Sequence, residues 1–450
     1  MNPACLRFLS YFAFLVISAA CLRAPAADRF WTNGLGGNFA GAVNWSGSLA
    51  PGLSDNANFA IGGAYTVSFT NSATNANAFF NGTGNLVIFN IGASNRWRLT
   101  DSFVVGQNAA NTAAVQLVAG ALVVTNSAGT GRLVVGQNGH GVFLLSGGAV
   151  VADQLFVTNN SSTNFTNSIF SLNSGALTTL HGSTVTQATD FVIGTVSNQT
   201  ATWNMLGGTN FIGVGTNSFG FDNYIVLGGA NGAVGAVVVD GAGTVWTNRG
   251  IMRVGSGVDN NKLTVTNGGT VITRGLEFGA NSGSSGNSLL VTGAGSLLSN
   301  QIFELDLGEF GSTNQARVTA GGRLVTSQIV LGGHIGNAPG GTNNSVVVDG
   351  SNSVLSATSF GGTGNSLPFG GVTVGQGGAS NLLIVTNGAL LQTFSAVIGS
   401  SSNAHHNSLI LSGNGSVWSN VNSGVTVGAF GASNRLVIEN GAKFLYTNGA

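Results

Sequence analysis

The side chains best suited to chemistry are three neighbouring carboxylates, Glu304, Asp306 and Glu309, followed by Arg317 and Arg323. Polysaccharide lyases and hydrolases need clustered carboxylates, or carboxylates that bridge calcium beside a basic residue. Glu304 and Asp306 are two residues apart and therefore share one face of a strand, from which they could bind a cation if that face is outward. We expect instead that all three are solvated charges on one irregular repeat unit, with no catalytic role.

The histidines offer little for metal binding. His405 and His406 lie in the polar stretch 400–407, and adjacent residues on a strand point to opposite faces. We therefore expect a solvated loop pair. We expect the remaining histidines to be isolated residues in turns: His140, His181 and His334.

Regularly spaced glycines divide the chain into units that must position any site. After Gly255 they recur at similar intervals as Gly268, Gly279, Gly293, Gly308, Gly321 and Gly332, and a longer interval separates Gly350 from Gly375. A fixed period is typical of a repeat protein whose units pack on their neighbours. Residues Phe360 to Phe369, inside the long interval, are expected to loop out of the repeat.

One type of half-unit is a short alternating strand that ends in Asn-Gly. Leu263, Val265 and Asn267 share a face under period-two alternation, and Asn-Gly supplies the positive φ angles of a sharp corner. We therefore expect the asparagines to point inward and form a ladder of amides, since a buried unpaired amide costs about 1–3 kcal/mol. The predicted corners are Asn267, Gly268, Asn387, Gly388, Asn440 and Gly441.

The other half-unit reads Val-x-Gly-x-Gly or a variant of it, with a large apolar residue five positions after the first glycine. The corner glycines are Gly241, Gly293, Gly350 and Gly413, and the apolar residues are Trp246, Leu298, Leu355 and Trp418. The two tryptophans could stack on sugars, but their equivalence to leucines favours packing in the core or between coils.

Short strands and corners without helical periodicity predict an all-β fold. A propeller blade takes about 40–50 residues and a solenoid coil about 20–30. The half-unit of roughly 24–29 residues fits one coil. We therefore predict a right-handed parallel β-helix, a solenoid with coils about 4.8 Å apart, and keep the propeller as the alternative.

The N-terminal hundred residues differ from the repeats. An apolar run follows Arg7 and precedes Ala24-Pro25-Ala26, which predicts a secretory signal peptide over residues 1–26. Lipid attachment at Cys21 is the alternative. Residues 27–100 hold half of the six tryptophans and predict an N-terminal Trp-rich cap with the first coils.

Residues 101–450 are predicted to form the repeat β-helix. The sequence stops in mid-repeat, and we expect the given chain to be incomplete, with a C-terminal anchor or export domain beyond it. Both cysteines lie in the predicted signal peptide, so the exported chain would have no disulfide and no thiolate metal site.

The composition limits the partners. Charged residues make up 6% of the chain and 43% are hydrophobic, a balance that argues against disorder. The 14 basic and 14 acidic residues give no electrostatic footprint for nucleic acid or an anionic membrane. We expect no cofactor, and membrane association only through a missing anchor or lipidation of Cys21.

Two motifs resemble a known bacterial repeat family. Val-Gly followed by Leu-x-Val-Thr-Asn-Gly-Gly, and Val-x-Gly-x-Gly-Ser-x-Trp-x-Asn, are similar to the type V secretion / PEP-CTERM-associated repeat of autotransporter-like passengers. The opening from Phe30-Trp31 to Asn44-Trp45 and Pro51-Gly52 is similar to the start of such proteins. The resemblance implies a right-handed β-helix at the surface of, or released by, a Gram-negative bacterium. The chain shows neither a β-barrel translocator nor a Pro-Glu-Pro sorting signal.

These observations predict a non-enzymatic, exported rod that acts as a structural or adhesin-like element. It would be secreted or held at the outer membrane or cell surface, and surface glycans or components of a host or neighbouring cell are the partners considered. Repetition along one face would raise avidity without any single strong site. Two alternatives stay open: a carbohydrate-active β-helix enzyme, and a passive spacer for a missing C-terminal module.

Overall fold

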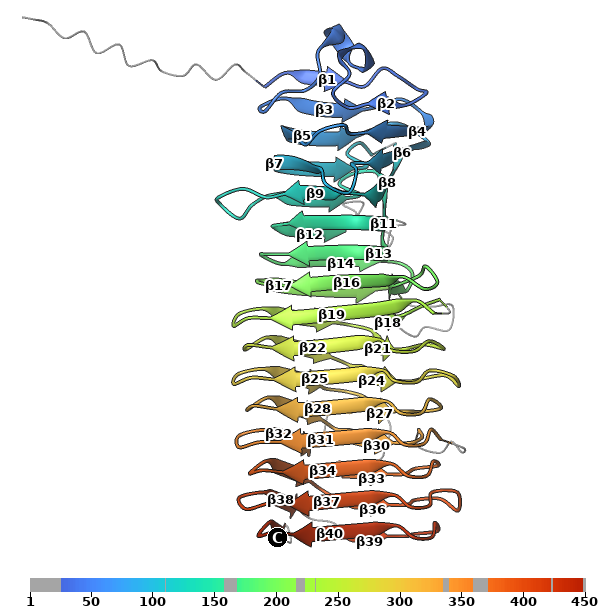
Figure 1. Ribbon diagram of the computed structural model, residues 1–450, viewed down its shortest axis with the longest axis vertical. Helices are drawn as coiled ribbons and strands as arrows, with labels where there is room; N and C mark the ends of the chain where they lie inside the picture. The colour runs from blue at the N-terminus through green and yellow to red at the C-terminus, as the bar shows by residue number, and fades with distance from the viewer. Residues whose placement is uncertain are drawn as a thin grey trace, which may run out of the picture.

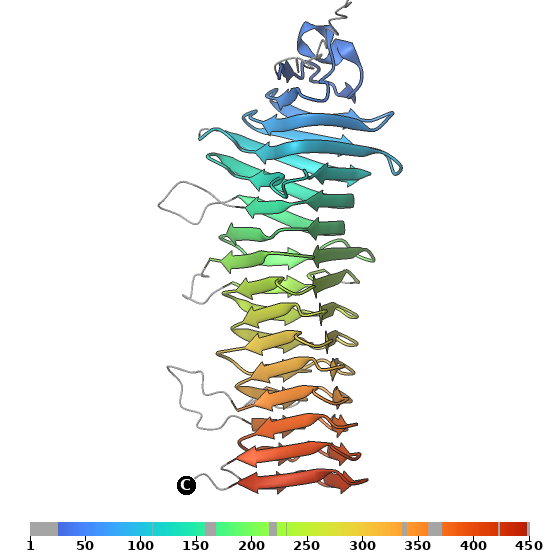
Figure 2. The ribbon, with the colours of Figure 1, turned by 90° about the vertical axis from the view of Figure 1, so that its left-hand side faces the viewer.

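The computed structural model describes residues 26–109, 111–157, 168–215, 223–230, 232–334, 340–358, 371–421 and 424–447. The described chain forms a rod in which strands run across the long axis and stack from one end to the other (Figure 1). The same stack is seen after a quarter turn about that axis (Figure 2). The predicted signal peptide up to residue 25, with Cys21, and the expected loop from Phe360 to Phe369 lie outside the described residues.

Each complete turn contributes three strand segments, and equivalent segments of successive turns pair in parallel to give three columns. We call these the first, second and third columns in chain order. The first column contains β2 (Gly37–Asn38), β4 (Gly63–Ser68), β6 (Asn85–Asn90), β8 (Thr112–Ala119), the first parts of β11 (His140–Ala152) and β13 (Ile169–Thr179), β15 (Phe191–Ile193), β18 (Ile225–Leu227), β21 (Ile251–Val254), β24 (Gly275–Phe278), β27 (Leu305–Leu307), β30 (Gln328–Leu331), β33 (Gly371–Val374), β36 (Ala396–Ile398) and β39 (Val425–Val427).

The second column contains the first parts of β5 (Ala73–Phe80) and β7 (Arg96–Val105), β9 (Ala121–Val124), the second parts of β11 and β13, β16 (Thr200–Met205), β19 (Val234–Asp240), β22 (Lys262–Thr266), β25 (Ser288–Thr292), β28 (Gln315–Thr319), β31 (Ser345–Asp349), β34 (Leu382–Thr386), β37 (Ser408–Ser412) and β40 (Arg435–Glu439). The third contains β1 (Asp28–Phe30), β3 (Asn56–Phe59), the second parts of β5 and β7, β10 (Arg132–Val135), β12 (Gln154–Val157), β14 (Ser183–Gln187), β17 (Thr209–Val214), β20 (Val245–Asn248), β23 (Thr270–Thr273), β26 (Leu297–Asn300), β29 (Arg323–Thr326), β32 (Val354–Ala357), β35 (Leu390–Thr393), β38 (Val417–Val421) and β41 (Lys443–Thr447).

The register shows that one half-unit of the sequence is one coil. Leu263 of one half-unit type lies opposite Leu289 of the other, and Leu289 in turn lies opposite Ala316 of the first type. The two half-unit types therefore occupy the same column in alternate coils. The predicted all-β parallel β-solenoid and its coil length are confirmed: the protein has about 14 turns, with coils of about 27 residues.

The core lies between the three columns. Leucine, valine and isoleucine at alternate strand positions point into it, because successive side chains of a strand face opposite sides. The four large residues of the second half-unit type are fully buried in the third column: Trp246, Leu298, Leu355 and Trp418. Their burial excludes a sugar-stacking role for the two tryptophans in this fold.

The prediction that the corner asparagines point inward is wrong. Asn267, Asn387 and Asn440 are exposed, with φ angles of 52°, 55° and 54°. The left-handed backbone at these positions ends the strand, so the alternation that holds through the preceding threonine or glutamate does not extend to the asparagine. The side-chain amides of Asn267 and Asn387 instead donate to Asp240 and Asp349 of the preceding coil, each at 2.7 Å.

The corner glycines have the same left-handed backbone. Gly268, Gly388 and Gly441 have φ angles of 86°, 84° and 81°. The first glycines of the other half-unit have φ angles of 94°, 91°, 90° and 91° at Gly241, Gly293, Gly350 and Gly413. Glycine adopts this conformation without the Cβ penalty that other residues incur.

The buried amide ladder exists at a different position, two residues before the first inward side chain of each strand. In this asparagine ladder, each side-chain oxygen accepts from both the backbone N–H and the side-chain amide of the preceding member; Asn314, for example, accepts from Asn287 at 3.0 and 2.9 Å. The ladder consists of the buried Asn261, Asn287, Asn314, Asn344, Asn381 and Asn407, and ends at the half-buried Asn434. It satisfies backbone donors where the chain turns from the first column into the second, which a strand ladder cannot do at a corner.

One corner departs from the asparagine pattern and predicts a stabilising substitution. Ala320 has a φ of 52° at the position equivalent to Asn267, and a left-handed conformation costs an ordinary L-residue about 1–2 kcal/mol. Ala320→Asn is expected to raise the free energy of unfolding by about 0.5–1 kcal/mol, measured as a higher urea midpoint. Ala294→Asn, at an exposed turn whose φ is not positive, is the control. An equal or lower midpoint for Ala320→Asn would show that the corner is unstrained.

Aromatic residues close the N-terminal end of the core. The Trp31 and Trp45 rings lie 5.1 Å apart edge to face, and both contact the Phe59 ring. Two 3₁₀ turns, η1 (Ala42–Asn44) and η2 (Ser46–Ser48), carry the chain across this end. The cluster is consistent with the predicted Trp-rich cap, and the first complete turn, β4 with β5, lies directly beneath it.

Asp55 ties the first strand to this cap and predicts an acid response. Its carboxylate accepts from the backbone N–H groups of Ala27 at 3.0 Å and Gly52 at 2.9 Å, with Arg29 Nε 3.6 Å away. Burial raises the pKa of Asp55, but these hydrogen bonds and Arg29 outweigh it and hold the pKa below its usual value. A lowered folded-state pKa contributes stability above the unfolded-state pKa of about 3.9, and this stability is lost as the pH falls through the folded-state value.

We therefore expect β1 to lose protection from hydrogen exchange, corrected for intrinsic rates, as the pH falls below about 4. Asp55→Asn should already expose β1 at pH 7 and should abolish this acid-dependent change. The β31 amides, far along the rod, are the internal control. If β1 in Asp55→Asn kept both the neutral protection and the acid response of the parent chain, Asp55 would not be the group responsible.

Candidate functional site

Charged side chains gather on the outward face of the first column, over consecutive coils. The register places Arg253 of β21, Glu277 of β24 and Asp306 of β27 one above another. In the next coil the same position holds Val330 of β30, and His334 follows that strand after two glycines. Stacking thus brings together residues that are separated by several coils of sequence, from Arg253 to His334.

The centre of this cluster is a histidine held between two carboxylates. His334 Nδ1 lies 2.7 Å from Asp306 Oδ2 and 3.2 Å from Glu304 Oε1. One ligand atom from each of the three side chains can be chosen so that all lie within 4.8 Å of one another. The Asp306 side chain is 2% exposed, against 23% for Glu304 and 36% for His334, so the group is closed on one side and open to solvent on the other.

Burial and the ion pair shift the titration of both partners. Burial raises the pKa of Asp306 to about 7, although the hydrogen bond from His334 acts in the opposite direction. That hydrogen bond raises the pKa of His334 to about 9, against the effect of burial. Burial, with the negative charge of Glu277, also raises the pKa of Glu309. A group that titrates near neutral pH can exchange protons in catalysis, and a histidine beside two carboxylates can bind a metal.

A second ion pair borders this group. Arg253 Nε donates to Glu277 Oε2 at 2.6 Å, and the Arg253 guanidinium lies 3.6 Å from the centre of the Tyr224 ring. Both side chains of the ion pair are partly exposed. The carboxylate and the aromatic face together hold the Arg253 guanidinium in place and limit its conformational freedom.

The expectation of three solvated carboxylates is therefore wrong for Asp306, which is buried beside His334. The two arginines named from the sequence do not join the cluster: Arg317 lies exposed in the second column and Arg323 exposed in the third. The arginine that the fold supplies is Arg253. The prediction relied on closeness in the sequence. In the solenoid, residues one coil apart are neighbours, whereas residues half a coil apart lie on different sides of the rod.

The predictions made for the histidines have different outcomes. His334 is not isolated, as described above, and His181 lies 3.4 Å from Asp153. His140 is the first residue of β11 and does not lie in a turn. His405 and His406 lie outside strands with ring centres 6.4 Å apart, and His405 Nδ1 accepts from the backbone of Ala432 at 2.9 Å.

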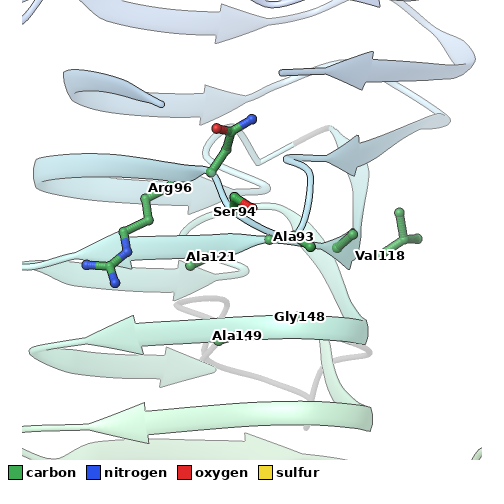
Figure 3. A pocket seen from close by; sticks show the side chains of 10 residues that line it. Ala93, Ser94, Arg96, Val118, Ala121, Gly148 and Ala149 are labelled. Atoms are coloured by element: carbon green, nitrogen blue, oxygen red, sulfur yellow. The ribbon is translucent and has the colours of Figure 1, made fainter. Parts of the chain in front are cut away.

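A groove of about 530 Å³ lies elsewhere, at the corner between the first and second columns. Figure 3 shows its wall of small residues, with Ala121 and Ala149 on neighbouring strands and Arg96 extending beside them. Ser94 and Asn95 add polar groups, and Arg96 adds a charged one. A groove walled by alanine and glycine provides space but no acid, base or metal ligand, so it offers no chemistry comparable to that around His334.

Sequence reasoning missed Arg253, Glu277 and His334 as members of the site. A signal was present, since Arg253, Glu277 and Asp306 each lie two residues before a periodic glycine. Aligning the coils by that glycine places the three at one register position. His334 carries no such signal, because it lies beyond the strand.

No helix among the described residues is long and apolar enough to cross a membrane. The β-solenoid is consistent with an autotransporter-passenger-like β-helix. Comparisons of the sequence with known protein families, with curated proteins and with solved structures find no match.

Proposed function

We propose that this protein is an exported bacterial rod that acts as a structural or adhesin-like element through many weak contacts along one face. The observation that carries the proposal is a continuous row of polar side chains at the end of the second-column strands, which we call the corner row. It repeats once per coil over eight consecutive coils: Asp240, Thr266, Thr292, Thr319, Asp349, Thr386, Ser412 and Glu439.

The corner row has the chemistry of a weak, repeated binding surface. Its hydroxyls and carboxylates are partly or fully exposed, and the exposed amides of Asn267, Asn387 and Asn440 border it. Such groups form hydrogen bonds with sugar hydroxyls, and equal spacing lets a polymer engage several coils at once. Each contact is weak alone, but linked contacts raise the overall affinity by orders of magnitude.

The predicted signal peptide and the repeat motifs support an extracellular role. The signal-peptide pattern predicts export, and the repeat motifs resemble those of type V secretion / PEP-CTERM-associated proteins of Gram-negative bacteria. We propose that the rod is secreted or held at the outer membrane. A polar surface with few charges, in a chain with equal numbers of basic and acidic residues, suits neutral glycans better than polyanions.

The test is binding of the full chain to glycan arrays and to immobilised polymers. We expect binding to long glycans, much weaker binding to their short oligomers, and a progressive loss when Thr266, Thr292 and Thr319 are changed to valine. The matched control changes three half-exposed hydroxyls of the third column, with Thr247→Val, Ser299→Ala and Ser419→Ala. Equal loss in the two triple variants would remove the corner row as the contact surface. No binding to any glycan or cell surface would instead favour the passive spacer.

A carbohydrate-active enzyme is the second candidate, and one observation favours it. Asp306, with its pKa raised to about 7, lies beside Glu304 on the outward face of the rod, where a polymer could reach the exposed edge of the group. A carboxyl that exchanges protons near neutral pH, with a second carboxylate nearby, is one requirement of general acid–base cleavage of glycosidic bonds. Release of reducing or unsaturated ends from plant or algal polysaccharides, abolished by Asp306→Asn, would establish the enzyme. No release from any polymer tested would leave the structural role.

A further inference from the structure

We propose that Glu304, Asp306 and His334 form a binding site for one divalent transition-metal ion, with Zn²⁺ as the best fit. The three side chains come from two consecutive coils, so the ion would link β27 to the segment that follows β30. The proposal does not depend on what the rod binds along its corner row.

The donor atoms already lie near the separations that a metal imposes. Ligands about 2.0–2.1 Å from a tetrahedral Zn²⁺ are about 3.3 Å from one another. His334 Nδ1 lies 3.2 Å from Glu304 Oε1 and 2.7 Å from Asp306 Oδ2. If the His334 Nδ1–Asp306 Oδ2 distance lengthened by a few tenths of an ångström, both contacts would match the separations around a bound ion.

A second observation points to a missing partner at this place. Among the described residues no group donates a hydrogen bond to Asp306 Oδ1, which is buried in a side chain that is only 2% exposed. A buried carboxylate oxygen without a partner costs free energy, which a coordinating cation would offset. The cluster therefore contains an unsatisfied acceptor as well as a set of acidic groups.

The register makes this burial unusual for the fold. The position of Asp306 holds Val330 in the next coil, and then Thr373, Val397 and Thr426. Apolar residues and threonine fill the position at no electrostatic cost. A carboxylate at this position lowers the stability of the metal-free rod, and a bound cation would offset that cost.

Charge and ligand type decide which cation fits. Four carboxyl groups (Glu277, Glu304, Asp306 and Glu309) lie around Arg253 and His334, and His334 must release its Nδ1 proton to coordinate a metal, so the cluster favours added positive charge. An imidazole nitrogen with carboxylate oxygens suits Zn²⁺ and other first-row divalent ions, whereas Ca²⁺ and Mg²⁺ prefer all-oxygen sets with more ligands. Three protein ligands leave one tetrahedral position for water or a ligand.

The experiment is calorimetric titration of the full, EDTA-treated chain with ZnCl₂, and separately with CaCl₂. We expect one Zn²⁺ per chain, at least 100-fold weaker binding of Ca²⁺, and a rise in the unfolding midpoint with Zn²⁺. His334→Gln and Glu304→Gln should each weaken Zn²⁺ binding at least tenfold. His181→Gln is the matched control, because His181 pairs with one carboxylate, Asp153, at 3.4 Å; its Zn²⁺ affinity should equal that of the parent.

A measurement on the parent chain avoids dependence on variants that fail to fold. X-ray absorption of the Zn²⁺-loaded protein should show a first shell of nitrogen and oxygen at about 2.0 Å with an imidazole contribution. Absence of stoichiometric binding would overturn the proposal. So would an affinity unchanged in His334→Gln, an equal loss in His181→Gln, or a first shell without imidazole.

Discussion

Asn314→Ala is expected to lower the free energy of unfolding by about 2–4 kcal/mol, because it interrupts the asparagine ladder in mid-rod. The oxygen of Asn314 accepts from the backbone N–H of Asn287 at 3.0 Å and from its side-chain amide at 2.9 Å. Both donors are buried. The substitution leaves that N–H without an acceptor, removes one partner of the amide, and opens a cavity beside Gly279, against which the Asn314 amide packs.

The measurement is urea unfolding together with hydrogen exchange, since a long repeat array can open coil by coil. Exchange should accelerate most in β25 and β28, the coils on either side of the break, and least near β4. Asn267→Gly is the matched control: Asn267 is exposed, and glycine tolerates its φ of 52°. We expect a change within about 0.5 kcal/mol for the control. A similar loss in both variants would mean that the buried ladder is no more important than the exposed corner.

Gly255→Ala is expected to be at least as damaging, at about 2–5 kcal/mol, because a backbone cost and a steric cost add. Gly255 has a φ of 79°, which costs alanine about 1–2 kcal/mol. A Cβ at this position would also overlap the side-chain amide of Asn287, which takes part in four hydrogen bonds. Overpacking of a rigid site adds about 1–3 kcal/mol.

Gly257→Ala separates the two causes. Gly257 has a φ of 80°, almost that of Gly255, but a Cβ there would meet no atom within 4 Å. Urea midpoints should therefore show only the backbone cost for Gly257→Ala and a clearly larger loss for Gly255→Ala. Equal losses would mean that backbone conformation alone, and not contact with the ladder, requires the periodic glycine.

The spacing of the glycines predicted the coil because it has a direct physical cause. Most of these glycines have positive φ angles, and Gly255, Gly279, Gly308, Gly332, Gly375 and Gly399 also abut ladder amides. The periodic glycines in the sequence thus mark corners that recur once or more in every coil. A period of about 27 residues with short alternating strands is enough to select a solenoid.

The orientation of the asparagines was not predictable by extending strand alternation. Alternation orients Leu263 and Val265 correctly, but the positive φ of Asn267 ends the strand and turns its side chain outward. Asn261 precedes the strand, where alternation says nothing, and its inward position follows from stacking on Asn287. Strand alternation therefore predicts side-chain orientation within a strand but not at the residues that flank it.

The sequence alone determined the solenoid, the length of its coils and the aromatic character of its N-terminal end, since each is encoded in local pattern repeated along the chain. Only the tertiary structure decided which charged residues meet. Arg253, Glu277, Asp306 and His334 become neighbours because stacking converts a separation of one coil into contact, while Arg317 and Arg323 are carried to other faces. The chemistry of the rod depends on register between coils, and register is set by packing and hydrogen bonding across the whole stack.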